Sequence, residues 1–549
     1  MKHLMYLFSL TLLLAGCLNS AEHNNDNSEA AGGSEPAQPK NISSRDRSIT
    51  KANSYSDLFF DSSLLRNYIA KNKPADSIAS RMISFYNARN YQFAWFNSDG
   101  FTEEAQAFWN MFDHYLTYSG DTSLKNKPLE KQMNRLLPDS FTVSASDKSY
   151  QQTELRLTES LMGYALKHFD KGYVKRKELE RFIPIKKEDP IQLADSLLSK
   201  KHKDNKYFED INPSYKSLKG QLQKYTDLYK KGGWPVIPPM KKLPKKGSSS
   251  PTIPLIKKYL AITSDMAGND TSAVYNDALA EGITNIQQRF GLNPTGHLTK
   301  DLLQEMNIPL RDRIEQLLIN MGRMRWMPSQ PKGSLIIVNI PEFNLHMLED
   351  GKKVFDMNVV VGKEGHSTMQ FTGTLNQIVF APYWNVPPKI VTHEILPEIQ
   401  KDKDYLRKNE MEDLGDKDGD GITDIRQLPG DKNSLGKVKF LFPNSFDIYL
   451  HDTPAKSLFN KERRAFSHGC IRLADAQKMA EYLLRNDPDW DAAKIEEAMN
   501  AKEQKFVKLK NTAEVFITYY TAWVDEEGRL NFRQDVYGHD KDITARLFE

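Results

Sequence analysis

The spacing of apolar side chains changes once along the chain, near residue 335, and this change constrains the fold most. Before it, apolar residues recur at helical intervals, as in Met82–Phe96 and again in Leu155–Leu166. After it, short apolar runs with β-branched residues, such as Leu335–Ile340 and Ile378–Pro388, are typical of strands. The sequence therefore predicts a multidomain α+β protein, all-α in its N-terminal part and mainly β in its C-terminal part.

A stretch rich in proline and lysine, residues 235–254, breaks any helix and marks a domain boundary. We place a helical scaffold at residues 54–240 before it and a smaller helical unit at residues 252–310 after it. Thr299 is predicted to cap the last helix of the smaller unit. A further helix, from about Asp312 to Trp326, fits either unit, and the sequence does not decide between them.

The N-terminal residues predict export. Lys2, the apolar run Leu4–Leu14 and the small residues before Cys17 form a secretory signal over residues 1–17. The run is too short to span a bilayer as a helix. Its ending resembles a bacterial lipobox, which implies a lipid on Cys17 and a membrane anchor; an ordinary secretory signal is the alternative. Residues 18–53 hold almost no large apolar side chains, so we expect a disordered tether.

Composition narrows the class of partner. Over 549 residues, 75 Lys+Arg and 72 Asp+Glu leave a formal net charge of only +3, which gives no support for a nucleic-acid partner. The chain has two cysteines, Cys17 and Cys470. With the first assigned to the anchor, no structural disulfide is possible, and the second is free for chemistry.

Cys470 and His451 form a candidate nucleophile and base. A thiol becomes a strong nucleophile when an imidazole accepts its proton. His451 ends a stretch, Phe446–His451, that alternates polar and apolar residues like a half-buried strand. Gly469 lets the backbone approach closely just before the thiol. The alternative for Cys470 is a buried, inert cysteine.

Two strings around these residues carry a family resemblance. Tyr449–Pro454 reads YLHDTP and Arg464–Leu473 reads RAFSHGCIRL. Together they resemble the signature of L,D-transpeptidases with a YkuD-type catalytic domain, in the large periplasmic branch. The resemblance implies that Cys470 attacks the amide between residues three and four of a peptidoglycan stem peptide, while His451 takes and returns the proton. Arg472 would bind a substrate carboxylate; a surface ion pair is the alternative.

Further site residues follow from this assignment. Backbone N–H groups of Gly469 and Cys470 are expected to stabilise the oxyanion of the tetrahedral intermediate. We also assign substrate binding to four residues near the motif or in the strand region before it, although each has a structural or core-packing alternative: Tyr449, Ser467, His468 and Trp384.

The resemblance extends beyond the motif. Parts of the 54–240 region look like the scaffold domain of the same branch, and its aromatic stripe is predicted as core rather than a glycan groove. Residues 252–310 resemble a three-helix peptidoglycan-binding module, and residues 333–549 would form the catalytic domain. The implied partners are stem peptides, glycan and, through the lipid, a membrane. The implied location is the bacterial cell envelope, facing the periplasm, with the leaflet undetermined.

A long insertion, about 390–437, is predicted as a cap over the active site. It contains aspartates with the spacing of a calcium loop, although the twelfth position is Gln427 instead of the expected Glu. The reaction requires no cofactor, so calcium would be structural; a solvated acidic turn is the alternative. The candidate ligands are Asp416, Asp418, Asp420 and Asp424.

The resulting hypothesis is an enzyme that forms 3–3 crosslinks between stem peptides through a Cys470 thioester. By the same resemblance, carbapenems should acylate this cysteine. An L,D-carboxypeptidase, or a lipid-anchored wall-binding protein without transpeptidase activity, is the alternative. The complete set of His451, Gly469, Cys470 and Arg472 favours the enzyme.

Overall fold

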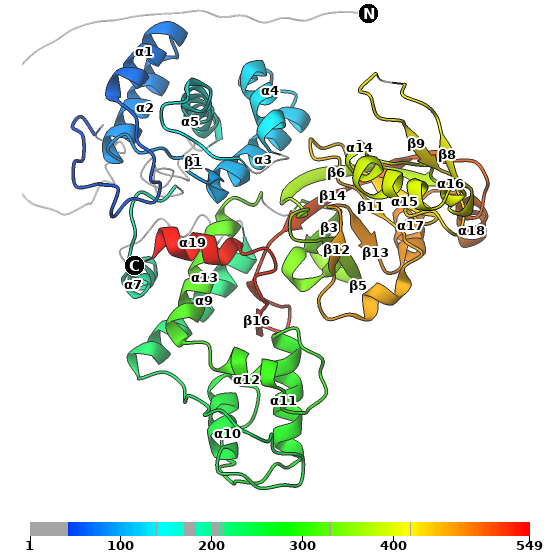
Figure 1. Ribbon diagram of the computed structural model, residues 1–549. Helices are drawn as coiled ribbons and strands as arrows, with labels where there is room; N and C mark the ends of the chain where they lie inside the picture. Colours follow the sequence, from blue (N-terminus) through cyan, green and yellow to red (C-terminus); the bar gives the residue numbers. More distant parts are fainter. Residues whose placement is uncertain are drawn as a thin grey trace, which may run out of the picture. The chain divides into compact units, whose positions relative to one another are not determined.

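The computed structural model describes residues 42–137, 141–168, 183–199, 209, 212–328, 331–417 and 419–548 (Figure 1). The chain divides into two units, residues 1–40 and 41–549, and everything below concerns the second. The predicted signal, Cys17 and most of the tether therefore lie outside the described residues, as does Asp418. Among the helices in the described ranges, none combines the length and apolar character needed to cross a bilayer.

Helices dominate the N-terminal part, with one short hairpin formed by β1 (Phe96–Asn97) and β2 (Gly100–Phe101). Asp61 and Thr102 cap the first turns of α1 and α3 through their side-chain oxygens. The helices are α1 (Ser62–Asn72), α2 (Asp76–Ala88), α3 (Glu103–Tyr118), α4 (Lys127–Leu136), α5 (Lys148–His168), α7 (Pro190–Leu198) and α9 (Pro213–Lys230).

The aromatic stripe of this part is core, as predicted. Phe93, Trp95 and Phe96 are fully buried. A buried carboxylate organises the stripe: Glu154 accepts hydrogen bonds from the backbone N–H of Trp95 at 3.0 Å and the hydroxyl of Tyr86 at 2.9 Å. Burial raises the pKa of Glu154 to about 7. These aromatic faces are therefore unavailable for stacking on a glycan.

Three helices follow: α10 (Ile253–Ile262), α11 (Asp277–Arg289) and α12 (Lys300–Met306). The Thr299 hydroxyl accepts from the N–H of Leu302, which confirms the predicted cap of α12. The next helix, α13 (Leu310–Arg325), packs against α7 and α9. The helix that the sequence left unassigned thus joins the N-terminal helices.

The C-terminal part is built on a nine-stranded mixed sheet in the order β12-β5-β13-β11-β10-β6-β14-β3-β4, and β4 also pairs with β5. This pairing closes the sheet into a barrel-like form, so the predicted α+β class is confirmed. Helices α17 (Ala476–Leu484) and α18 (Ala492–Met499) add side chains to its core. The strands are β3 (Ser334–Asn339), β4 (Asn344–Glu349), β5 (Lys352–Gly362), β6 (Phe371–Phe380), β10 (Val438–Leu441), β11 (Leu450–His451), β12 (Ala465–Ser467), β13 (Ile471–Leu473) and β14 (Lys505–Thr518).

The apolar character of the chain continues from Val515 to Val524, but one strand does not span this segment. Strand β14 ends at Thr518, and β15 (Ala522–Val524) pairs with β16 (Leu530–Phe532) in a separate hairpin. The cause lies at Thr521, whose N–H and hydroxyl are both hydrogen bonded to Asn320 of α13. The hairpin therefore packs into the helical core, and α19 (His539–Leu547) follows it.

The predicted cap region contains short elements with an apolar cluster of their own (yellow in Figure 1). Val386, Val391, Ile395 and Ile425 form the buried part of this cluster. Its elements are β7 (Trp384–Asn385), α14 (Pro388–Ile390), η3 (Val391–Ile395), α15 (Leu396–Lys401), α16 (Tyr405–Lys408), β8 (Met411–Asp413) and β9 (Ile425–Gln427).

Candidate active site

Strand register brings the predicted site residues together. In the parallel pair β11 and β13, His451 lies opposite Arg472 and Leu450 opposite Ile471. Opposed residues share a face of a sheet, and faces alternate along each strand. Leu450 and Ile471 face the buried core, so His451 and Arg472 occupy the other face. Cys470, two residues before Arg472, lies on that same side.

The turn that presents the thiol is held by Ser467. Its hydroxyl donates to the carbonyl of Cys470 at 2.5 Å and accepts the N–H of Gly469 at 3.2 Å. Gly469 has φ +117°, a conformation that side-chain-bearing residues rarely adopt. Ser467 is 2% exposed. A hydroxyl used twice within the turn braces the backbone, and substrate binding by Ser467 stays a prediction.

The imidazole of His451 is oriented by a backbone carbonyl. Its Nδ1–H donates a hydrogen bond to the carbonyl oxygen of Asp452, at 2.5 Å. This bond leaves Nε2 as the acceptor. Burial, together with the charge of Arg472, lowers the pKa of His451 to about 3. The residue is consequently a neutral imidazole throughout the physiological range.

The thiol is also neutral at rest. Burial raises the pKa of Cys470, against the opposing effects of Tyr449 and Arg472. Its sulfur hydrogen bonds to the carbonyl of Asp447 at 3.7 Å, and no bond to His451 is formed in the described structure. Catalytic hydrogen bonds often tighten only when substrate binds. The imidazole on β11 and the thiol directly before β13 are thus an uncharged pair.

The two predicted oxyanion donors are not equivalent. The Gly469 N–H is already bonded to Ser467, which differs from the expectation that it faces the substrate. The Cys470 N–H has no hydrogen-bond partner among the described residues. Cys470 itself is therefore the better candidate to donate to an oxyanion.

Arg472 has an unused polar group. Its Nε is buried and has no hydrogen-bond partner within the described ranges, and burial lowers the pKa of the guanidinium. Buried donors without partners are rare in folded proteins and are explained when a ligand supplies the acceptor. This observation supports the predicted carboxylate site over the surface ion pair.

A second set of residues, missed by the sequence, fixes the Gly469 loop. The Thr368 hydroxyl donates to the carbonyl of Gly469 at 2.7 Å and accepts the N–H of Gly362 at 2.9 Å. The Tyr537 hydroxyl donates to the carbonyl of Gly362 at 2.7 Å. A Cβ on Gly362 would lie 2.0 Å from the carbonyl oxygen of His366, so only glycine fits. No local signal could reveal this, because the partners are far apart in sequence.

The remaining predicted residues lie at different depths. Tyr449 is beside the thiol. Burial raises the pKa of its phenol, and a Cys470 thiolate, with a hydrogen bond to that residue, acts in the same direction. His468 reaches the cap region, where its Nε2 lies 2.8 Å from the carboxylate of Glu394. Its ring also lies 4.8 Å from that of His366. Trp384, in contrast, packs on the apolar cluster of the cap.

The acidic loop forms hydrogen bonds with its own backbone. Asp416 accepts from the N–H of Gly419 and Gly421, at 2.8 and 3.0 Å, and Asp424 accepts from that of Lys417 at 3.2 Å. Among the described residues, no three carboxylate, thiol or imidazole side chains converge as metal ligands. Because Asp418 is outside those residues, calcium binding stays a prediction.

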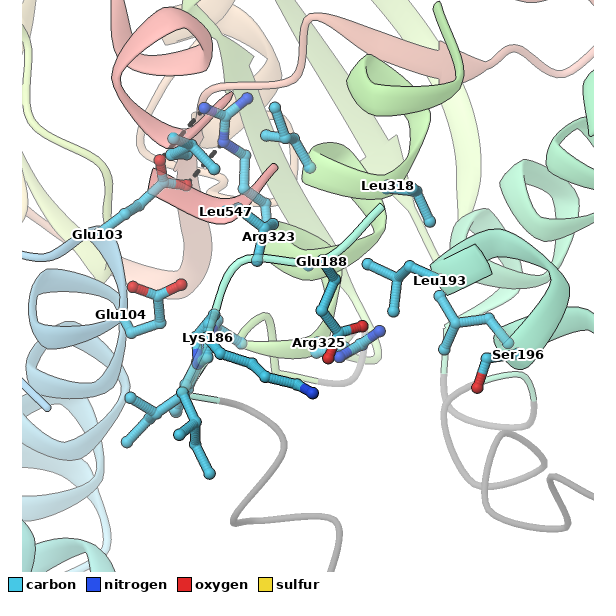
Figure 2. Close-up of a pocket in the computed structure, with 18 of the residues that line it drawn as sticks. Glu103, Glu104, Lys186, Glu188, Leu193, Ser196, Leu318, Arg323, Arg325 and Leu547 are labelled. Atoms are coloured by element: carbon cyan, nitrogen blue, oxygen red, sulfur yellow. Dashed lines mark hydrogen bonds and ion pairs between the residues drawn. The ribbon is translucent and has the colours of Figure 1, made fainter. Parts of the chain in front are cut away.

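A cavity of about 450 Å³ lies elsewhere, among helical elements (Figure 2). None of the predicted site residues lines it. Three of its charged groups have partners within the protein: Arg323 pairs with Glu103, as the dashed lines show, and the Tyr55 hydroxyl donates to Glu104 at 2.8 Å. Burial raises the pKa of Glu104 to about 7. The cavity is separate from the candidate active site.

Comparisons with known proteins point to one family. Residues 333–492 match the model of YkuD, the L,D-transpeptidase catalytic domain, and residues 80–222 match that of the Scaffold domain. Neither range includes residues 252–310, so peptidoglycan binding by that unit stays a prediction. A protein of Haemophilus influenzae, named as a proposed L,D-transpeptidase, is 31% identical over 291 residues, which is 50% of this chain and 57% of that relative. The chain thus spans little more than half the length of that relative.

Solved structures include two distant matches. An L,D-transpeptidase from Mycobacterium smegmatis is 15% identical, with 34% of this chain and 58% of that chain covered and a TM-score of 0.18. An L,D-transpeptidase from Stackebrandtia nassauensis is 16% identical, with coverage of 51% and 98% and a TM-score of 0.22. At these scores the likeness supports no statement about this chain.

Proposed function

The chain carries a YkuD-type L,D-transpeptidase catalytic domain and a Scaffold domain, and we propose that it forms 3–3 crosslinks between peptidoglycan stem peptides through a Cys470 thioester. The observation that carries the proposal is the shared sheet face of His451 and Arg472, with Cys470 directly before β13 and its backbone N–H without a partner among the described residues. A nucleophile, a proton acceptor and a carboxylate-binding cation are what acyl transfer between peptides requires.

The proposed reaction has two halves. The Cys470 sulfur attacks the carbonyl carbon of stem residue three while its proton passes to Nε2 of His451. The Cys470 N–H donates to the oxyanion, and collapse breaks the amide bond as His451 protonates the leaving amine. An acceptor amine then attacks the thioester and gives its proton to His451. The crosslink forms, and the sulfur leaves as a thiolate that recovers the proton.

The cap supports transfer to an amine over hydrolysis. Glu394 of η3 contacts His468, one residue before Gly469, and thereby ties the cap to the thiol loop. Exclusion of water protects a reactive acyl intermediate until an amine arrives. An L,D-carboxypeptidase, in which water is the acceptor, is the second candidate because the same residues serve both reactions.

The envelope setting is part of the proposal. A lipid on Cys17 would anchor the protein to a membrane, and residues 18–53 would let the folded part reach the wall. Binding of glycan by residues 252–310 would keep the enzyme on its substrate.

Calcium at Asp416, Asp418, Asp420 and Asp424 would order the cap. Calorimetric titration of calcium into wild type and Asp418→Ala tests this proposal, and an equal absence of heat at millimolar calcium would exclude the site.

The decisive assay is chromatography with mass spectrometry of muropeptides after incubation with wild type or Cys470→Ala. We expect dimers joined through their two third residues with wild type and none with the variant. Tripeptides without dimers would identify a carboxypeptidase, and no change with either protein would favour a wall-binding role. Carbapenem adducts on Cys470 are expected in the same mass spectra.

A further inference from the structure

A third cation lies on the active face of the sheet. Lys439 of β10 is opposite His451, which in turn is opposite Arg472. Opposed side chains share a face, so His451 lies in one row between an ammonium and a guanidinium. The other neighbours in this row, Val379 and Val360, are fully buried, which makes the row polar only at its centre.

The ammonium of Lys439 has no acid to neutralise it. It lies 5.7 Å from the centre of the Tyr449 ring, and no hydrogen bond or carboxylate partner is found for it in the described part of the chain. Burial lowers the pKa of Lys439, and Cys470 opposes this effect only when its sulfur is ionised. A half-buried cation without a counter-ion is costly unless a ligand provides one.

The reaction places an anion near this position. A stem tetrapeptide ends in a free carboxylate on residue four, the residue that leaves. The leaving nitrogen must receive its proton from His451, and the carboxylate carbon is two bonds from that nitrogen. It therefore lies close to a residue that flanks His451. Arg472 lies in β13, the strand that begins directly after Cys470, and flanks His451 on one side, whereas Lys439 of β10 flanks it on the other.

We propose that Lys439 is a specificity residue that binds the terminal carboxylate of the leaving fourth residue, while Arg472 serves the acyl side. This inference rests on the proposed function. It explains why the enzyme would prefer a donor peptide with a free C-terminal carboxylate. A stem peptide without a carboxylate near its reacting nitrogen would not be bound by Lys439. Lys439 therefore selects the donor peptide by the carboxylate of its fourth residue.

The test compares two synthetic tetrapeptide donors, one ending in a carboxylate and one in a carboxamide, by kcat/KM for release of residue four. Hydrogen bonds to charged groups contribute about 1.5–3 kcal/mol, so wild type should prefer the acid by about 10- to 100-fold. Lys439→Met should reduce the ratio to about one, and Lys439→Arg should keep most of it. Lys508→Met, an exposed lysine of β14, is the matched control and should retain the wild-type ratio.

Several outcomes would overturn the inference. If Lys439→Met keeps the preference while an Arg472→Met variant loses it, Arg472 binds the terminal carboxylate. If Lys439→Met slows alkylation of Cys470 by iodoacetamide and leaves the ratio unchanged, Lys439 acts on the thiol. Should Met disturb folding, as judged by circular dichroism, Lys439→Gln takes its place. A wild type that cleaves neither donor would instead contradict the proposed function itself.

Discussion

At the scale of single residues, the resting site is an uncharged thiol and imidazole. Many cysteine nucleophiles are activated as a thiolate beside a charged histidine. Here burial lowers the pKa of His451 to about 3 and raises that of Cys470. Proton transfer must therefore accompany attack on the substrate, after binding has brought the two side chains together.

This state predicts the pH profile of thiol alkylation. Because the pKa of the Cys470 thiol is raised above the ordinary value of about 8.5, the reactive thiolate forms only at correspondingly higher pH. The rate of iodoacetamide modification of Cys470 should then climb through pH 9 and show no step between pH 5 and 7, where an ordinary histidine titrates. A rate that is already maximal at pH 6 would demonstrate an ion pair and contradict this description.

A second residue prediction concerns Thr368, which is 3% exposed. Thr368→Val removes the hydroxyl that joins Gly362 to Gly469. Loss of a buried hydrogen bond costs about 1–3 kcal/mol, and we expect kcat to fall about tenfold or more because the thiol loop loses its position. Thr374→Val, which removes a hydroxyl bonded to Glu514 away from the site, is the control. Equal kcat values for both variants would show that the Thr368 contact has no role in catalysis.

At the scale of elements, β4 and β5 are joined by a charged histidine. His346 lies between Glu342, at 3.0 Å, and Asp356, at 2.7 Å. Burial opposes its charge, but the two carboxylates outweigh this and raise the pKa of His346 to about 10. Its unfolded value is about 6.5. The contribution of charged His346 to the free energy of unfolding is therefore fully present below pH 6.5 and is lost as pH rises through 10.

His346→Gln should therefore destabilise the protein at pH 6 and have little effect at pH 10. Urea unfolding of both proteins across this range measures the difference in free energy of unfolding. A difference that does not change with pH would mean that the charge of His346 contributes nothing. The comparison between variants cancels the titration of lysines and tyrosines common to both.

The elements also show what sequence can predict. The cap at Thr299 is a local signal, and the structure has an N-cap there. The alternation in Phe446–His451 is only partly realised, because the strand is confined to Leu450–His451 and Asp447 has a positive φ. Pairings between distant segments have no such signal. The bond from Thr521 to Asn320, which ends β14 early, could not be predicted because its cause lies outside the strand.

The candidate site follows the same rule. Cys470, His451, Gly469 and Arg472 were predicted because the motif is contiguous or nearly so. Lys439 was missed because only the register of β10 against β11 places it beside His451. The bracing role of Ser467 within the turn was missed because a serine in a motif gives no indication of which way its hydroxyl points.

At the scale of the whole molecule, the C-terminal segment connects the sheet to the helices. After β14 it enters the helical core as the β15–β16 hairpin, and Tyr537 then reaches back to Gly362. Arg323 of α13 secures the arrangement through Glu103, at 2.7 Å, and Asp540, at 2.6 Å. A single buried guanidinium thus holds carboxylates from α3 and α19.

Arg323→Met should destabilise the protein strongly. Removing one partner of a buried ion pair leaves uncompensated charge and costs about 3–5 kcal/mol. The free energy of unfolding in urea measures this, and Arg529→Met, which removes an exposed pair with Asp525, should change it by less than about 1 kcal/mol. Similar values for the two variants would show that the Arg323 cluster is not a structural link.

The most direct test of the central claim is intact-protein mass spectrometry of the enzyme quenched in acid during turnover of a tetrapeptide donor. The account predicts a mass increase equal to the donor without residue four, located on Cys470 by peptide mapping and released by hydroxylamine, and no increase on Cys470→Ala. His451→Ala should show the adduct only slowly. Turnover without any adduct on wild type, or an adduct on another residue, would contradict the Cys470 thioester.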